Sequence, residues 1–120
     1  MTTISSFRDL AVWQEAHKLV LMIYKATASF PATEQFGLTS QMRRAAVSVP
    51  ANIVEGFKRR GWQEKVRFYN IAEASLEELK YYLILANDLT YIADIKPLET
   101  QAEAVGRLLF CFSEGVKEKH

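Results

Sequence analysis

Apolar side chains recur at intervals of three and four residues in four separate stretches of this 120-residue chain. This spacing is the period of an amphipathic α-helix, because it places one face of every turn toward a core. Five glycines and three prolines divide the chain into these stretches, as helix-ending residues do. The sequence therefore predicts helices over residues 10–29, 38–58, 62–91 and 97–116.

Short connections over residues 31–37, 58–61 and 93–96 join the predicted helices. Helices joined by short loops pack as antiparallel neighbours, and no stretch of useful length alternates as a strand does. We therefore expect an all-α fold, an up-down-up-down antiparallel four-helix bundle, with residues 1–120 as a single domain. Pro50 lies inside the second helix, where it lacks an amide and pushes against a carbonyl, so we expect a kink near Ala46.

The same spacing predicts the inner face of each helix. The residues expected inside are Val12, Ala16, Leu19, Ile23, Ala26 and Phe30, then Leu38, Met42, Ala45, Val49, Ile53 and Gly56, then Phe68, Ala72, Ser75, Leu79, Leu83 and Ala86, and finally Leu98, Ala102, Val105, Leu109 and Phe112. Further apolar residues that widen the third stripe are Ile71, Leu76, Tyr82 and Leu89. The chain has more large apolar residues than one four-helix core can bury, and the six in excess are Trp13, Val20, Leu21, Tyr24, Ile84 and Leu85. We expect this surplus at an interface.

Known patterns of catalytic and metal-binding residues are missing from the sequence. Gly56 and Gly61 lack the Lys-Ser/Thr ending of a phosphate loop, and no Glu-x-x-His pair of a di-iron bundle occurs. One cysteine, Cys111, forms no internal disulfide, and with only His17 and His120 beside it no zinc site can be built. We expect no enzymatic activity, no metal and no cofactor, with Cys111 and His17 at the surface or an interface.

The charges are unevenly distributed along the chain. The formal net charge is +1, yet residues 1–70 hold ten basic and five acidic side chains, and residues 71–120 hold five basic and nine acidic. Opposed charges on two parts of one surface favour head-to-tail contacts between copies, which close into a ring when the rotation permits. A homo-oligomer is therefore expected.

Seven basic residues form the candidate nucleic-acid site: Arg43, Arg44, Lys58, Arg59, Arg60, Lys65 and Arg67. Aromatic residues Phe57, Trp62 and Tyr69 are interleaved with them. Cationic groups for phosphates and rings for unstacked bases are how single-stranded RNA or DNA is bound without sequence reading. An ordinary solvated turn, an acidic protein partner and a neighbouring subunit remain alternatives.

A polar line follows one edge of the second predicted helix and includes Arg44, Ser48, Asn52 and Glu55. Ser75 and Glu78 lie where the third helix would face it. We expect a structural network, not an active site, with Arg44 bonded to Glu78 and Asn52 to Ser75. The Arg44–Glu78 pair is expected to be a buried ion pair, whose disruption is costly.

The apolar runs over residues 19–24 and 81–86 are far shorter than the roughly 20 residues of a membrane helix. The first residues also lack the basic and apolar parts of a signal peptide. We expect no membrane association and a cytoplasmic location.

Three segments, residues 7–16, 41–56 and 68–79, resemble the 23S rRNA intervening-sequence protein family, also called the four-helix-bundle protein family. The most specific of them carries Arg-Arg-x-x-x-Ser-x-Pro-x-Asn-Ile-x-Glu-Gly, residues 43–56. The resemblance spans nearly the whole chain in the same order.

This resemblance implies a cytoplasmic bacterial bundle that assembles as a homopentameric ring and has no known enzymatic activity. The family is in turn similar to the accessory subunit of diversity-generating retroelements, a basic pentameric bundle that binds its reverse transcriptase and nucleic acid. We therefore expect a ring-forming, non-enzymatic, RNA-associated binding protein. The alternative is a protein-interaction scaffold that does not bind nucleic acid directly.

Overall fold

The computed structural model describes residues 5–120, and within that range the regular elements are all helical. Four α-helices follow one another, α1 (Ala11–Thr27), α2 (Leu38–Lys58), α3 (Trp62–Asp88) and α4 (Lys96–Glu118). Two short 3-10 helices, η1 (Phe7–Asp9) and η2 (Ala32–Glu34), precede α1 and α2. The expected all-α class with four helices is confirmed.

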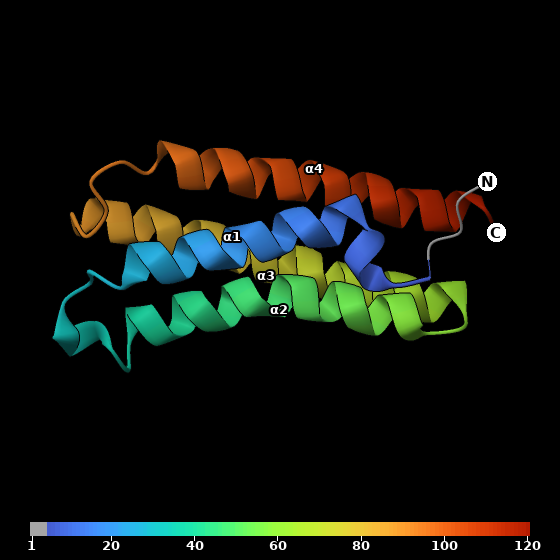
Figure 1. Cartoon of the computed structure of the whole chain (residues 1–120), viewed down its shortest axis with the longest axis horizontal. Helices are drawn as coiled ribbons and strands as arrows, with labels where there is room; N and C mark the ends of the chain where they lie inside the picture. The colour runs from blue at the N-terminus through green and yellow to red at the C-terminus, as the bar shows by residue number, and fades with distance from the viewer. Residues whose placement is uncertain (1–4) are drawn as a thin grey trace.

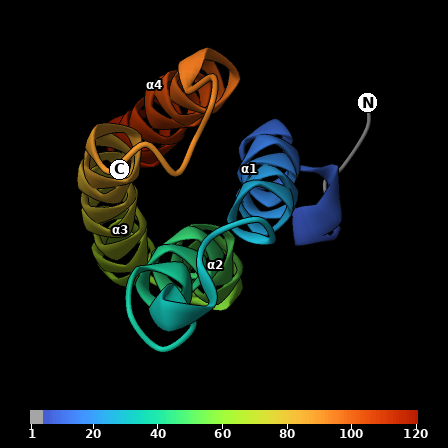
Figure 2. The same ribbon diagram turned by 90° about the vertical axis from the view of Figure 1, so that its left-hand side faces the viewer.

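The four helices lie along one direction and form a rod of 47 × 24 × 20 Å. The chain reverses at each connection, so the α1–α2 and α3–α4 connections lie at one end and the α2–α3 turn at the other (Figure 1). Seen end-on, the helices follow the order α1, α2, α3, α4 around a common core (Figure 2). Each packs on its neighbours in that order, and α2 makes its most extensive contact with α3.

The first and third helices differ from prediction at their ends. Leu10 precedes α1 in an extended conformation with no side-chain cap, and the Ser6 hydroxyl accepts from Arg8 N in η1. Helix α3 ends at Asp88 because Thr90 has a positive φ of 63°. Thr90 N then bonds Asn87 O and Tyr91 N bonds Ala86 O, which is a Schellman ending.

Helix α2 continues without interruption through Pro50, which is itself buried. The continuity follows from the apolar stripe, which keeps its phase on both sides of the proline and is fully buried at Val49 and Ile53. The kink expected near Ala46 stays a prediction.

Most of the residues predicted to face inward lie in the core, but at the start of α3 the buried face is not the predicted one. Val66 and Tyr69 are buried there, and Phe68 is only half-buried. Tyr69 turns inward because it packs on Phe112 of α4, with ring centroids 4.9 Å apart. Ile71, expected to widen the stripe, is 38% exposed.

The expected apolar surplus is only partly at the surface. Val20 belongs to the core, and Trp13 and Leu85 are half-buried against it, since α1 packs on both α2 and α4 and so buries a wide face. Leu21, Ile84 and Tyr24 are exposed. None of the helices within residues 5–120 is both long and apolar enough to cross a bilayer.

Candidate nucleic-acid interface

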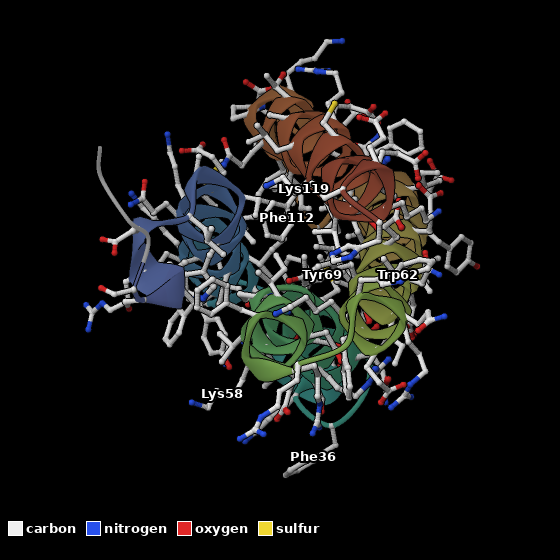
Figure 3. All side chains as sticks on the ribbon, turned by 90° about the vertical axis from the view of Figure 1, so that its right-hand side faces the viewer. Phe36, Lys58, Trp62, Tyr69, Phe112 and Lys119 are labelled. Carbon is white, nitrogen blue, oxygen red and sulfur yellow. The ribbon has the colours of Figure 1, made fainter. Side chains whose placement is uncertain are left out.

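The α2–α3 turn brings five of the seven predicted basic residues together at one end of the bundle: Lys58, Arg59, Arg60, Lys65 and Arg67. Helix α2 ends at Lys58 as Arg59 becomes extended, and α3 starts one residue after Gly61. The last turn of α4 lies at the same end of the molecule, where Figure 3 shows Lys58, Trp62 and Lys119. We call Lys58, Arg59, Arg60, Lys65 and Arg67 the basic turn.

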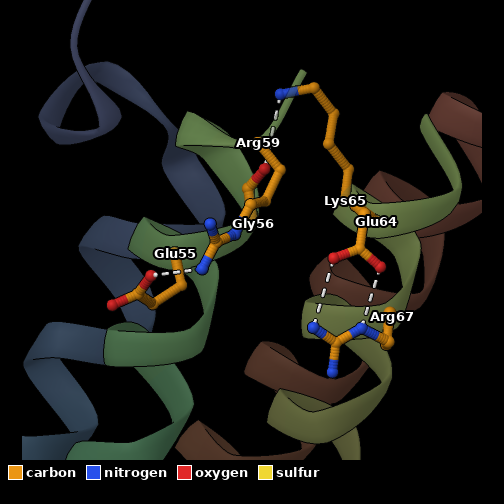
Figure 4. A network of polar contacts seen from close by, with 6 residues as sticks. All are labelled: Glu55, Gly56, Arg59, Glu64, Lys65 and Arg67. Carbon is orange, nitrogen blue, oxygen red and sulfur yellow. Dashed lines mark hydrogen bonds and ion pairs between the residues drawn. The ribbon is translucent and has the colours of Figure 1, made fainter. Parts of the chain in front are cut away.

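Lys65 closes the turn. Its ammonium donates to the carbonyl oxygens of Phe57 at 2.7 Å and Gly56 at 3.3 Å, and so satisfies the open end of α2 (Figure 4). The same group lies 5.7 Å from the centroid of the Phe57 ring. Burial lowers the pKa of Lys65. Lys65 is thus a structural cation and not a free phosphate ligand.

Gly56 lets the two helices approach at this turn. A Cβ at Gly56 would lie 2.5 Å from Cε1 of Tyr69 and 3.1 Å from the carbonyl oxygen of Lys65. Tyr69 is 1% exposed, and burial raises its pKa to about 12. Tyr69 therefore packs against the turn from the core side. The expectation that it offers a ring to bases is wrong.

Arg59 and Arg67 form a half-exposed pair around Phe68. Arg59 bonds Glu55 at 3.3 Å, and Arg67 holds Glu64 through two bonds of 2.9 and 3.2 Å (Figure 4). Both guanidinium carbons lie over the Phe68 ring, at 4.6 and 4.5 Å from its centroid. The result is an aromatic ring flanked by two planar cations at the surface.

The carboxylates beside these arginines mark positions where an anion fits. The hydrogen bond from Arg67 lowers the pKa of Glu64, and the pKa of Arg67 is raised in return. All four side chains of the two ion pairs are close to half exposed, so solvent weakens both pairs. A phosphate can replace a carboxylate on such an arginine, because each offers two anionic oxygens that can accept from the guanidinium fork.

Lys58 and Arg60 are exposed to solvent, as are Arg59 and Arg67, but they differ from these arginines in their partners. Among residues 5–120, no carboxylate lies within ion-pair distance of Lys58 or Arg60. With Glu55 and Glu64 counted against its five cations, the basic turn has a local net charge of +3.

Arg43 and Arg44 lie elsewhere. They are about 15 residues before the turn on a continuous helix, which is roughly 22 Å at 1.5 Å per residue. Arg43 donates to Thr27 Oγ1 at 2.9 Å and lies 4.5 Å from the Tyr24 ring centroid, so it ties α2 to α1. Arg44 bonds Glu78 of α3. The structure does not bring these two arginines into the basic turn.

The polar residues between α2 and α3 form two small clusters instead of one network. Ser48 and Ser75 hydroxyls lie 2.8 Å apart, and Asn52 donates to Ser48 Oγ at 3.0 Å, so Asn52 reaches Ser75 through Ser48 and not directly. Glu55 points to Arg59 in the turn. These contacts join the two helices at mid-height.

The second cluster centres on Glu78, which accepts from Arg44 and, at 2.6 Å, from Tyr82. The Tyr82 bond, followed by the Arg44 bond, lowers the pKa of Glu78. The side chains of Arg44 and Glu78 are 51% and 37% exposed, so the expected burial of this pair is wrong. Tyr82 was expected only to widen the apolar stripe, but its i,i+4 spacing from Glu78 allows it to donate here.

The remaining aromatic and sulfur groups show no reactive arrangement. Trp62 stacks on His120 with centroids 5.9 Å apart, and His17 stacks on Trp13 at 5.1 Å. Cys111 is exposed on α4. Within the part of the chain that the structure describes, no three His, Cys, Asp or Glu residues are grouped to hold a metal ion.

The fold is similar to a solved crystal structure, that of a protein with unknown function from the S23 ribosomal protein family of Bacteroides thetaiotaomicron VPI-5482. The two share 21% identity and a TM-score of 0.77, over 86% of this chain and 98% of that chain. No curated protein matches the sequence.

The sequence of this chain also matches a family of known description. The model of the 23S rRNA-intervening sequence protein family matches residues 8–111, which include α1, α2, α3 and the basic turn. The chain therefore belongs to the 23S rRNA-intervening sequence protein family.

Proposed function

We propose that this up-down-up-down four-helix bundle is a non-enzymatic, RNA-associated binding protein of the bacterial cytoplasm, and that it acts as a ring of identical subunits. The basic turn is its contact with RNA. The observation that carries the proposal is the presence of Lys58 and Arg60, two exposed cations without a carboxylate partner among residues 5–120, beside Arg59, Arg67 and the Phe68 ring.

Binding would begin with phosphate contacts to Lys58 and Arg60. Arg59 and Arg67 would then exchange the carboxylates of Glu55 and Glu64 for phosphate oxygens, and Arg67 would keep its two-bond geometry. An unstacked base can lie against the half-buried Phe68 or Trp62, since aromatic rings accept any base. This mode binds single strands without reading their sequence. Because the net charge of the chain is only +1, such a basic site must be local.

We propose further that the resemblance of the family to the basic accessory subunit of diversity-generating retroelements extends to nucleic-acid binding by this chain. The family's description places its members with ribosomal RNA inserts. Both supports concern relatives, so the test must be made on this chain.

The test is a salt series with a fluorescent single-stranded RNA oligonucleotide, followed by anisotropy. Each phosphate contact contributes a slope of about −0.7 in log K against log salt, so two to four contacts per subunit predict roughly −1.4 to −2.8. The double variant Lys58→Gln, Arg60→Gln should lower the affinity and flatten the slope. Its matched control is Lys18→Gln, Lys25→Gln, which removes the same charge from exposed positions on α1.

Absence of RNA binding at low salt in the wild type would overturn the proposal. Equal losses of RNA affinity in the turn variant and in the α1 control would also overturn it, because binding would then depend on the net charge of the protein and not on the basic turn.

The second candidate function is a protein-interaction scaffold for an acidic partner. It is favoured by one specific observation, namely that Arg59 and Arg67 already hold carboxylates. An acidic peptide would compete with the RNA oligonucleotide for the same turn. If the peptide binds and the RNA does not, the scaffold is the function.

A further inference from the structure

Two carboxylates lie within the basic turn, each bonded to one of its arginines. Glu55 accepts from Arg59 Nη2 at 3.3 Å, four residues along the chain. Glu64 accepts from both Nε and Nη2 of Arg67, three residues along (Figure 4). In the free protein both arginines therefore already hold the kind of acceptor that a phosphate would offer. We call Glu55 and Glu64 the internal carboxylates.

The two arginines are also held by a contact that does not involve the internal carboxylates. Their guanidinium carbons lie 4.6 and 4.5 Å from the centroid of the Phe68 ring, which makes a cation–π contact with each. Breaking an ion pair thus frees the hydrogen-bond donors of the arginine while the ring still orients its side chain. A ligand that replaces the carboxylate meets oriented donors, which lowers the entropy lost on binding.

The two ion pairs are weak, but each forms within one chain. All four side chains are 46–57% exposed, so an anionic ligand can displace the carboxylates. The hydrogen bond from Arg67 lowers the pKa of Glu64, which stays ionised at neutral pH. Because each carboxylate is tethered three or four residues from its arginine, its effective concentration is on the order of millimolar. A single anion from solution must compete with a carboxylate at that concentration.

Lys58 and Arg60 stand on either side of Arg59 in the sequence and are free of such competition. Both are exposed, and among residues 5–120 neither has a carboxylate within ion-pair distance. We call Lys58 and Arg60 the open cations. Once a strand has bound the open cations, its next phosphates are tethered to the turn, just as the internal carboxylates are. Those phosphates then compete for the paired arginines on equal terms.

We infer that Glu55 and Glu64 determine which anions the basic turn accepts. They hold Arg59 and Arg67 against single anions and release them to a strand of linked phosphates that the open cations have already bound. The inference rests on the RNA contact in the proposed function and adds how its ligand is selected, namely as a chain of phosphodiesters and not as inorganic phosphate. The internal carboxylates lower the affinity of the turn for every anion, and a polyanion recovers that loss through its additional contacts.

The first test removes the internal carboxylates while keeping the size of their side chains. Glu55→Gln, Glu64→Gln should raise the affinity for a fluorescent oligouridylate by roughly 4- to 25-fold, because each half-exposed ion pair opposes the ligand by a factor of roughly 2 to 5. With Lys65 bonded to backbone carbonyls, the net charge of the other four cations and the internal carboxylates rises from +2 to +4. The slope of log K against log salt should therefore steepen from about −1.4 to about −2.8.

The matched control is Asp88→Asn, Glu99→Gln, which makes the same change in net charge. Both residues are exposed and lie beside the α3–α4 connection, at the other end of the bundle from the basic turn (Figure 1). The control should keep the wild-type slope and gain less affinity than the Glu→Gln variant. Circular dichroism of every variant shows that the helices are retained.

A further variant separates the contact from the charge. Glu55→Asp, Glu64→Asp keeps both negative charges but shortens each side chain by one methylene group, so each carboxylate reaches its arginine less well. If this shortening halves the opposing free energy, the affinity for oligouridylate rises by roughly 2- to 5-fold with the wild-type slope. An effect of charge alone predicts no gain.

Side-chain NMR of Arg67 tests the selection between anions. Arg67 Nε donates to Glu64 at 2.9 Å, so its N–H resonance reports the loss of that bond. In the wild type the resonance should shift when oligouridylate is added but not when inorganic phosphate is added at the same phosphate concentration and ionic strength. In the Glu→Gln variant both additions should shift it. If inorganic phosphate shifts the wild-type resonance as strongly as oligouridylate does, the selection is overturned.

The outcomes separate this inference from the proposed function. If the wild type binds oligouridylate and the Glu→Gln variant binds no more tightly than the control, the inference is overturned and the basic turn stands as the RNA contact. A Glu→Asp variant without any gain has the same meaning. If the Glu→Gln variant binds and the wild type does not, the inference is supported and RNA binding by the unmodified protein is overturned. If neither binds, both are overturned.

Discussion

Two groups of basic residues, Arg43 with Arg44 and the five residues of the basic turn, have different surroundings. Arg43 and Arg44, in the middle of α2, are bonded to α1 and α3. The basic turn at the end of α2 has one structural cation, Lys65, and leaves Lys58 and Arg60 in solvent. A cation beside a packed neighbour thus bonds helices together, whereas Lys58 and Arg60 at the helix end stay exposed to solvent.

The largest expected effect comes from disturbing the packing beneath the basic turn. Gly56→Ala should lower the free energy of unfolding by about 1–3 kcal/mol, because its Cβ would overlap Tyr69, even though alanine is the better helix former. Gly61→Ala is the control, since nothing lies within 4 Å of its added Cβ. Its cost should be about 0.5 kcal/mol. Urea unfolding measures both, and equal losses would contradict the close approach at Gly56.

A crossed pair of variants tests the comparison itself. Arg43→Gln should destabilise the protein by about 1–2 kcal/mol, through loss of a charged hydrogen bond and a cation–π contact, with RNA affinity unchanged. Arg60→Gln should change stability by less than about 0.5 kcal/mol and weaken RNA binding. Unfolding curves and anisotropy on both variants make the measurement. If Arg43→Gln lowers RNA affinity as Arg60→Gln does, the distinction between the two groups is lost.

A smaller effect is expected in the polar contact one turn from Arg44. Ser75→Ala removes the partner of Ser48 at a position only 8% exposed. The cost should be about 1 kcal/mol, with the urea dependence unchanged. A neutral result would show that Asn52 alone satisfies the Ser48 hydroxyl.

The smallest effect is a pH dependence at Glu78. The folded-state pKa of Glu78 is lowered by Tyr82 and then Arg44, so its contribution is present above the unfolded pKa, near 4.3, and is lost as the pH falls through the folded value. Glu78→Gln should therefore cost less than about 1 kcal/mol at neutral pH, given the exposure of the pair. The difference from the wild type should vanish at lower pH.

Thermal unfolding of both proteins between pH 7 and pH 3 measures this difference. A difference that stays constant over the range would remove the ionised carboxylate as its cause. No difference at neutral pH, in stability or in assembly, would remove Glu78 from the structural contacts altogether.

The sequence was a good guide to the elements and a poorer guide to their ends. The second helix has the predicted bounds, residues 38–58, because a continuous apolar stripe and flanking glycines define it locally. The third ends three residues before the prediction, at Asp88, because Thr90 adopts the left-handed conformation that usually selects glycine. No local signal marks such a threonine.

The sequence by itself determined four amphipathic helices, their order and most of their buried faces, since helical periodicity depends only on residues within a few turns of each other. The tertiary structure alone decided the roles of the basic residues. It turned Tyr69 inward against Phe112, left Phe68 between Arg59 and Arg67, and bonded Lys65 to the end of α2. The physical reason is that these outcomes depend on the register of one helix against another, which residues distant in the sequence fix together.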